Sequence, residues 1–247
     1  MKTSARVLLL LAAVAFNSSG LASGTDTSAY QGALFNGDSK KFYDTVHSGG
    51  PTMLSVTVSI QQQKRTLRDP SGWTEEIKVN HLDGVLGLDL TKWLTLYGGG
   101  GAADVSKENL ASSSNGEFLF GGTIRVLDYM VLEPWNDIDN YWVGIDLNSY
   151  YRSSSLDYGS YTIDMSEVFG SLTMSIYTRP ERPGVWDRLG FYIGPAVSTL
   201  SVGNQNEDQM FGFIGGLQLN PNPNMGLKLE VQQFDGMGMG ASFAFHF

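Results

Sequence analysis

The sequence contains no cysteine, and this absence removes several classes of structure and chemistry together. Disulfide frameworks, thiol nucleophiles and cysteine-based metal sites all require that residue. Histidine is also scarce, with only His47, His81 and His246. Because histidine is the side chain that most readily exchanges protons near neutral pH, acid–base catalysis has few candidates here. We therefore expect no metal centre, no cofactor and no catalytic site.

The sequence has few charged residues, and its net charge is negative, which does not suit anionic partners. Only 17% of the residues are charged, and the formal net charge is −9. A protein that binds nucleic acid, or that lies on an anionic membrane surface, needs a basic patch. The composition therefore predicts no nucleic-acid partner.

The sequence also lacks a long hydrophobic run. Its longest, Val7 to Phe16, follows the basic residues Lys2 and Arg6 and precedes a stretch of small residues ending near Ala22. A helix needs roughly 20 apolar residues to span a bilayer, whereas a secretory signal needs only about 7–15. We predict a signal peptide over residues 1–22, a flexible periplasmic N-terminal segment over 23–51, and a single domain over 52–247.

Glycine and aromatic residues are abundant, with 30 Gly, 13 Phe, 11 Tyr and 5 Trp. From Thr52 onward, apolar residues alternate with small or polar residues, which is the pattern of a strand with two different faces. The pattern predicts strands at 54–61, 82–90, 94–101, 117–126, 141–148, 167–176, 189–194, 211–219, 227–232 and 237–247.

An even number of amphipathic strands after a secretory signal is typical of a membrane-spanning barrel. We predict an all-β fold, a closed antiparallel transmembrane β-barrel of about ten strands (8–12). Its polar stretches predict extracellular loops near 63–79, 104–115 and 152–161, and the short turns fall at 91–92 and 220–224. A soluble periplasmic β-sandwich or lipocalin-like binder shows the same alternation with its apolar face inward, and it stays open as an alternative.

The closing segment Met239-Gly240-Ala241-Ser242-Phe243-Ala244-Phe245-His246-Phe247, with the signal and the strands, resembles the small outer-membrane barrel families called porin-like or opacity-protein-like. The resemblance covers roughly residues 52–247. It implies an outer-membrane location, with membrane lipid and lipopolysaccharide as surroundings. It also implies that Phe243, Phe245 and Phe247 form the C-terminal signal read by the barrel-assembly machinery.

The charged residues on the non-apolar strand faces are the candidate functional residues. They are Asp83, Asp89, Glu117, Arg125, Asp146, Glu167, Lys228 and Glu230. We expect them to face the lumen, with Arg125 and Lys228 as the main cations. Charges in a confined interior need partners or water, so these residues form either internal ion pairs or the lining of a narrow, cation-favouring passage.

Other motifs carry less chemistry. His81 and Asp83 share one strand face, and we expect them near the extracellular mouth, where a barrel hydrolase or acyltransferase would need them. Gly98-Gly99-Gly100-Gly101 lacks the following lysine of a nucleotide-binding loop and instead predicts strong curvature or close packing.

We therefore predict a non-enzymatic outer-membrane barrel, either structural or a narrow channel for small polar solutes or cations. A barrel with adhesive extracellular loops is the first alternative.

Overall fold

The structure, a computed structural model, describes residues 35–36, 54–91, 93–107, 110–111, 115–131, 141–158, 161–178, 188–222 and 224–246. The predicted signal peptide, nearly all of the predicted N-terminal segment and Phe247 lie outside these residues. The strands are β1 (Phe35–Asn36), β2 (Leu54–Arg68), β3 (Thr74–Thr91), β4 (Leu94–Lys107), β5 (Leu110–Ala111), β6 (Asn115–Val131), β7 (Tyr141–Tyr158), β8 (Tyr161–Thr178), β9 (Arg188–Val202), β10 (Gln205–Glu207), β11 (Phe211–Asn222), β12 (Met225–Gln233) and β13 (Met237–His246). Among the described residues, no helix is long and apolar enough to cross a membrane.

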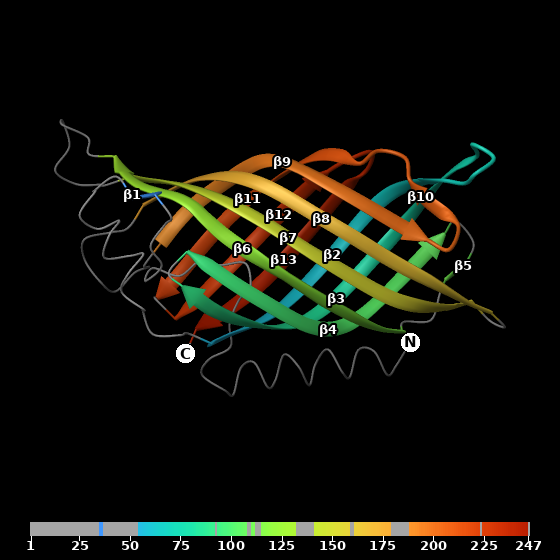
Figure 1. The fold of residues 1–247 in the computed structure, drawn as a ribbon, viewed down its shortest axis with the longest axis horizontal. Helices are drawn as coiled ribbons and strands as arrows, with labels where there is room; N and C mark the ends of the chain where they lie inside the picture. The colour runs from blue at the N-terminus through green and yellow to red at the C-terminus, as the bar shows by residue number, and fades with distance from the viewer. Residues whose placement is uncertain are drawn as a thin grey trace.

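Ten long strands form one closed sheet (Figure 1). Each pairs antiparallel with the next long strand along the chain, and β13 closes the ring by pairing antiparallel with β2, from Met239 opposite Gln62 to His246 opposite Ser55. The three short strands add to its ends: β1 pairs parallel with β6, β5 pairs with β4, and β10 lies between β2 and β9. The predicted fold class, a closed antiparallel barrel of ten strands, is confirmed.

The alternation in the sequence becomes the inside and outside of the wall. On β2, Ser55 and Thr57 are buried inside, whereas Leu54, Val58 and Ile60 are exposed. As far as the structure describes them, the ten predicted runs each lie in one long strand with the predicted apolar face outward; the last run is described to His246. We call the outward apolar residues the outer belt; its exposed members include Leu54, Val58, Ile60, Leu86, Leu90, Leu96, Phe118, Phe120, Leu147, Val168, Leu172, Met174, Leu189, Phe191, Ile193, Val197, Phe211, Phe213, Leu217, Leu227, Leu229, Val231, Met237 and Met239. This distribution is that of a barrel wall surrounded by lipid.

The barrel extends well beyond the outer belt at one end. We call the end where β13 finishes the base, and the opposite end, where β10 lies, the top (Figure 1). The predicted loops near 63–79, 104–115 and 152–161 were wrong over most of their length: β2 runs to Arg68, β3 starts at Thr74, β4 runs to Lys107 and β7 runs to Tyr158. The connections described at the top are therefore short.

The turn between β2 and β3 is one of these short connections, and hydrogen bonds hold it in place. Asp69 Oδ1 accepts hydrogen bonds from the Ser71 amide (2.8 Å), the Ser71 hydroxyl (2.6 Å) and the Trp73 amide (3.0 Å). The hydrogen bonds from Ser71 above all hold the pKa of the exposed Asp69 carboxyl below its usual value. Gly72 has a φ of 90°, a conformation that favours glycine.

The polarity of the wall reverses toward the top. On the upper parts of β2, β3 and β8 the outward residues are polar, among them Gln62, Lys64, Glu76 and Asp164. On β3 and β8 the inward residues at this height are apolar, such as Ile77 and Met165, whereas on β2 the inward Gln63 and Arg65 are still polar and the apolar Leu67 lies above them. Because an apolar exterior suits lipid and a polar exterior suits water, this reversal indicates that the top projects beyond the bilayer.

The glycine run of β4 brings strands β3 and β4 unusually close on the inner face. A Cβ placed on Gly99 would lie 2.1 Å from the Gly84 carbonyl oxygen, and one on Gly101 would lie 2.0 Å from the Leu82 carbonyl oxygen. A Cβ on the outward-facing Gly98 would meet nothing closer than 3.6 Å. The inward glycines thus permit the close backbone approach that the sequence predicts for this run.

Candidate functional site

An apolar layer fills the interior at the top. Its members come from β2, β3, β4, β7, β8 and β9 and are each between 0% and 8% exposed. We call this the top layer: Leu67, Ile77, Val79, Ala103, Val105, Leu156, Met165, Leu200 and Val202. Because packed protein interiors hold few voids larger than a water molecule, we expect the top layer to close the interior at its level.

A layer of buried charges lies directly below. We call it the arginine layer: Arg65, Arg152, Asp83, Glu117, Glu167 and Glu207, all with side chains no more than 4% exposed. The alternation of inward residues along β2 shows the order, since Arg65 precedes Leu67 of the top layer by one inward position.

Arg152 is the centre of this layer. Its guanidinium lies 2.9 Å from Asp83 Oδ2, 3.2 Å from Glu117 Oε1 and 3.5 Å from Glu167 Oε2. It also donates a hydrogen bond to Gln61 Oε1 at 3.3 Å. One side chain on β7 therefore links carboxylates on β3, β6 and β8.

Arg65 holds the other side of the layer. Its Nη1 lies 2.6 Å from Glu207 Oε1, and its Nη2 lies 3.5 Å from Glu167 Oε1. The guanidinium also donates to Gln63 Oε1 and lies 3.8 Å from the centre of the Phe234 ring. Because Glu167 contacts both arginines, the two halves form one network.

Four carboxylates in this layer face only two guanidinium groups. Among neighbouring groups, His81 Nδ1 lies 3.0 Å from Glu117 Oε2, and the Ser198 and Tyr150 hydroxyls donate to Glu167. Burying a charge is costly unless it is paired and hydrogen-bonded. The excess of acid means that positive charge, as a proton or a cation, is favoured at this level.

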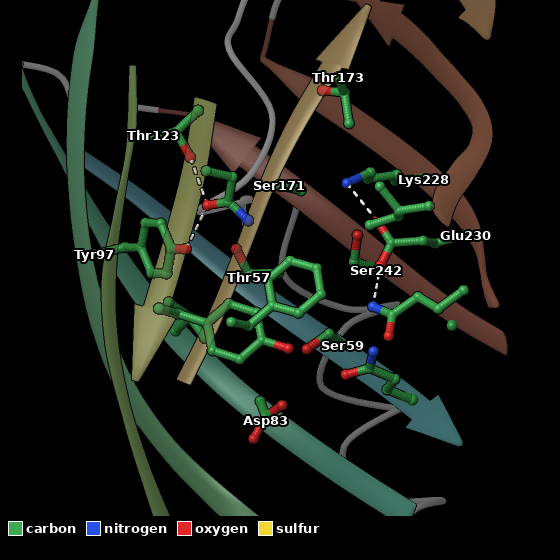
Figure 2. A pocket seen from close by; sticks show the side chains of 18 of the residues that line it. Thr57, Ser59, Asp83, Tyr97, Thr123, Ser171, Thr173, Lys228, Glu230 and Ser242 are labelled. Carbon is green, nitrogen blue, oxygen red and sulfur yellow. Dashed lines mark hydrogen bonds and ion pairs between the residues drawn. The ribbon is translucent and has the colours of Figure 1, made fainter. Parts of the chain in front are cut away.

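A cavity of about 130 Å³ lies below the arginine layer, lined by many hydroxyl, amide and charged side chains and also by the apolar Val85, Leu119, Phe169 and Ile214. Figure 2 shows hydroxyl side chains from several strands around it, including Thr57, Ser59, Thr123, Ser171 and Thr173. A cavity of this size and polarity has room for several water molecules.

One wall of the cavity carries an ion pair. Lys228 Nζ lies 2.7 Å from Glu230 Oε2 (Figure 2). Glu230 also accepts hydrogen bonds from the Tyr192 hydroxyl (2.8 Å) and Gln232 Nε2 (3.0 Å). On the opposite wall the Tyr97 hydroxyl donates to Asn148 Oδ1 at 2.6 Å. These contacts fix the lining side chains in place.

Nearer the base the charges are paired locally. Arg125 binds Asp146 through two parallel hydrogen bonds, Nε to Oδ1 at 2.8 Å and Nη2 to Oδ2 at 2.9 Å. Asp89 accepts a hydrogen bond from the Thr95 hydroxyl, and Asp128 accepts one from the Tyr177 hydroxyl. Among the described residues, no group of three or more His, Asp or Glu side chains is arranged to hold a metal ion.

All eight charged residues selected from the sequence lie in the interior, but they form three separate groups and one single residue. Asp83, Glu117 and Glu167 meet at Arg152; Arg125 pairs with Asp146; Lys228 pairs with Glu230; and Asp89 stands apart. The expectation that Arg125 and Lys228 are the main opposing cations was wrong. Arg65 and Arg152 pair with the largest acidic group. Both lie in segments, 63–79 and 152–161, for which the sequence predicted extracellular loops.

His81 does not lie at an open mouth. It is 3% exposed, Val79 and Ile77 of the top layer follow it toward the top, and its Nδ1 faces Glu117. Asp83 is held by Arg152 instead. The expected position of this pair was therefore wrong, because β3 continues above it.

The aromatic residues of the closing strand face outward. Phe243 pairs with Val58 and Phe245 with Val56 across the β13–β2 seam. Their role as an assembly signal stays a prediction.

No protein-family model matches the sequence, and neither does any curated protein. Among solved structures, the chain is similar to an outer membrane channel from Pseudomonas putida F1 (12% identity, 79% of this chain and 95% of that chain, TM-score 0.38). It is also similar to the translocator domain of autotransporter NalP from Neisseria meningitidis (11%, 84% and 92%, TM-score 0.32) and to the outer membrane protease OmpT from Escherichia coli (9%, 81% and 95%, TM-score 0.32). Their identities and TM-scores are too low to transfer a role from any of them.

Proposed function

We propose that this chain is a non-enzymatic outer-membrane barrel whose interior is closed at rest. The outer belt supports the location, since leucine, phenylalanine and methionine side chains that are about half exposed are costly in water and favourable in lipid. The top, with polar residues outside, would face the exterior, and the base would face the periplasm.

The closed interior is supported by one observation above all: the top layer packs directly above the arginine layer. Both layers consist of side chains that are almost completely buried, and together they draw residues from eight strands. The same burial argues against catalysis at His81, because a substrate from the exterior would have to pass the top layer first. The short described connections give little support to the adhesive-loop alternative.

A second function, a gated passage for small cations, is favoured by the charges below the top layer. Four carboxylates face two guanidinium groups there, and the polar cavity continues toward the base. Charged rings of this kind select ions of opposite sign. A displacement of the top layer would then open a cation-selective path.

Single-channel recording in planar bilayers tests the closed state. We expect the wild-type barrel to show no stable conductance. Changing Leu67, Leu156 and Leu200 to alanine removes large side chains from the top layer, and this variant should conduct and prefer cations. If the triple variant does not insert, Leu156→Ala alone tests the same point.

The matched control changes three leucines of the outer belt to alanine, namely Leu86, Leu96 and Leu217, which are 63%, 46% and 56% exposed. This control should remain non-conducting, because it alters only the lipid-facing surface. Stable wild-type conductance, or a top-layer variant as silent as the control, would contradict the proposed closure.

A further inference from the structure

Strand β10 completes the wall at the top, above the level that β11, β12 and β13 reach. Strand β11 starts at Phe211, and β13 pairs with β2 only as far as Gln62. Strands β9 and β2 continue above these points, to Val202 and Arg68. Of the strands in the described part of the chain, β10 alone joins β2 to β9 there (Figure 1). A strand of three residues therefore closes the ring at the top.

The two sides of β10 are attached differently. On the β9 side it forms a tight hairpin through Gly203, whose φ of 61° favours glycine. On the β2 side two residue pairs join the strands, Asn206 with Arg68 and Glu207 with Leu67. Strands β2 and β3, by contrast, are paired over the whole length of β2. The seam between β10 and β2 is thus a short ladder between segments that lie far apart in the chain.

Ion pairs hold this seam on both faces of the wall. On the inside, Glu207 Oε1 lies 2.6 Å from Arg65 Nη1, and both side chains are 1% exposed. Glu207 Oε2 also accepts a hydrogen bond from the Leu200 amide on β9 at 3.0 Å. On the outside, Arg68 Nη2 lies 2.6 Å from Asp208 Oδ1, where both side chains are partly exposed. Because buried pairs depend on both partners and exposed pairs contribute little, Glu207 and Arg65 form the main latch of the seam.

The arginine layer and the cavity lie directly behind the seam. Arg65 Nη2 lies 3.5 Å from both Glu167 Oε1 and Gln232 Oε1, and Gln232 lines the cavity. An opening between β10 and β2 would therefore lead from the side of the barrel to the charged interior. On the outer face the residues of β2 at this height are the charged Lys64 and Arg68, which are about half exposed. The opening would thus face water and not lipid.

We propose that this seam is the gate of the cation passage: Glu207 releases Arg65, and β10 moves outward together with the hairpin that joins it to β9. The proposal rests on the gated passage proposed above, and it locates the moving part at the edge of the top layer, beside Leu67. Moving a long strand would break two long ladders of hydrogen bonds. Opening this seam leaves the ring below it closed by the pairing of β13 with β2.

The arginine layer still favours cations when the seam is open. After Glu207 has moved away, three carboxylates remain beside two guanidinium groups; they are Asp83, Glu117 and Glu167, beside Arg65 and Arg152. The remaining excess of negative charge selects ions of opposite sign. Cations that enter at the seam therefore meet an acidic layer before they reach the cavity.

A disulfide lock combined with single-channel recording in planar bilayers tests the gate. Because the sequence contains no cysteine, Arg68→Cys with Asn206→Cys introduces two thiols that have no competitors, on residues paired directly across the seam. Glu207→Gln removes the charge that holds Arg65 and keeps the size of the side chain. We expect Glu207→Gln to show repeated cation-selective openings, which the wild type lacks. In the variant with all three changes, oxidation should abolish the openings and reduction should restore them.

Glu76→Gln is the matched control. Glu76 also pairs with a cation of β2, Lys64 at 2.7 Å, but it lies on β3 and not on β10. This variant should stay as silent as the wild type. If Glu207→Gln does not insert, Asn206→Pro tests the same seam, because proline cannot donate a hydrogen bond to the ladder.

Openings of Glu207→Gln that persist after oxidation of the lock would overturn the gate and leave the closed resting state in place. Silent Glu207→Gln and Asn206→Pro variants, or equal openings in Glu76→Gln, would also overturn it. Stable conductance of the barrel with wild-type Glu207, if oxidation of the lock stops it, would support the gate and instead contradict the closed resting state.

Discussion

Arg152 joins three carboxylates from three strands at the centre of the interior. Removing its charge while keeping its bulk, as in Arg152→Met, leaves Asp83, Glu117 and Glu167 buried with less compensation. Breaking one partner of a buried ion pair costs about 3–5 kcal/mol, so we expect a loss of that order in the free energy of unfolding. Urea titration of the barrel in lipid vesicles measures it.

Arg68 supplies the control for this prediction, because it also pairs with a carboxylate, Asp208 at 2.6 Å, but is 55% exposed. Exposed pairs contribute about 0–1 kcal/mol, so Arg68→Met should change stability little. Equal effects of the two variants would show that the arginine layer is not a stabilising network.

The alternation of residues was enough to predict that the eight selected charged residues face inward. It was not enough to recognise Arg65 and Arg152 as inward-facing strand residues. Around Arg65 the sequence reads Gln61-Gln62-Gln63-Lys64-Arg65-Thr66, and after Arg152 it reads Ser153-Ser154-Ser155. Both faces of the strand are polar there, because the outside has already entered water while the inside is still charged. Such a polar stretch resembles a loop. Only the inward apolar residues that follow it, Leu67 and Leu156, indicate that the strand continues.

At the scale of the element, the strand cores could be predicted and their lengths could not. The outer belt produces a clear period of two, and each predicted run lies within a strand. Above the belt the period persists with the faces exchanged, as in Ile77 and Val79 inward against Glu76 and Lys78 outward. The predicted strands were recognised by their apolar outward faces. They are shorter than the observed strands because the outward face is apolar only within the outer belt.

The glycine run of β4 gives a prediction at this scale. Gly99→Ala should destabilise the barrel by about 1–3 kcal/mol, the usual cost of overpacking, because its Cβ would meet backbone atoms of β3. Gly98→Ala, one residue away on the outer face, should be tolerated. The midpoint temperature of unfolding, followed by the heat-dependent mobility shift on gels, compares the two; similar midpoints would show that β3 and β4 do not need this close approach.

At the scale of the whole molecule, the barrel is a wall whose two faces change character at different heights. The outside is apolar up to the outer belt's upper edge and polar above it. The inside below the arginine layer combines hydroxyl and charged side chains with apolar and aromatic clusters, and above that layer it is apolar. Each face thus has the polarity that its surroundings favour if lipid surrounds the belt and water surrounds the top. The fold class could be predicted from the sequence, whereas the packing of the top layer and the arginine layer depends on contacts between strands far apart in the chain.

The central claim, a barrel inserted in the outer membrane, is tested most directly by cell fractionation followed by gel electrophoresis in SDS with and without boiling. A closed barrel resists SDS until it is heated, because every strand edge of the ring is paired. We predict that the protein is found in the outer-membrane fraction and that boiling changes its mobility. Recovery in the soluble periplasmic fraction, with the same mobility before and after boiling, would contradict the account.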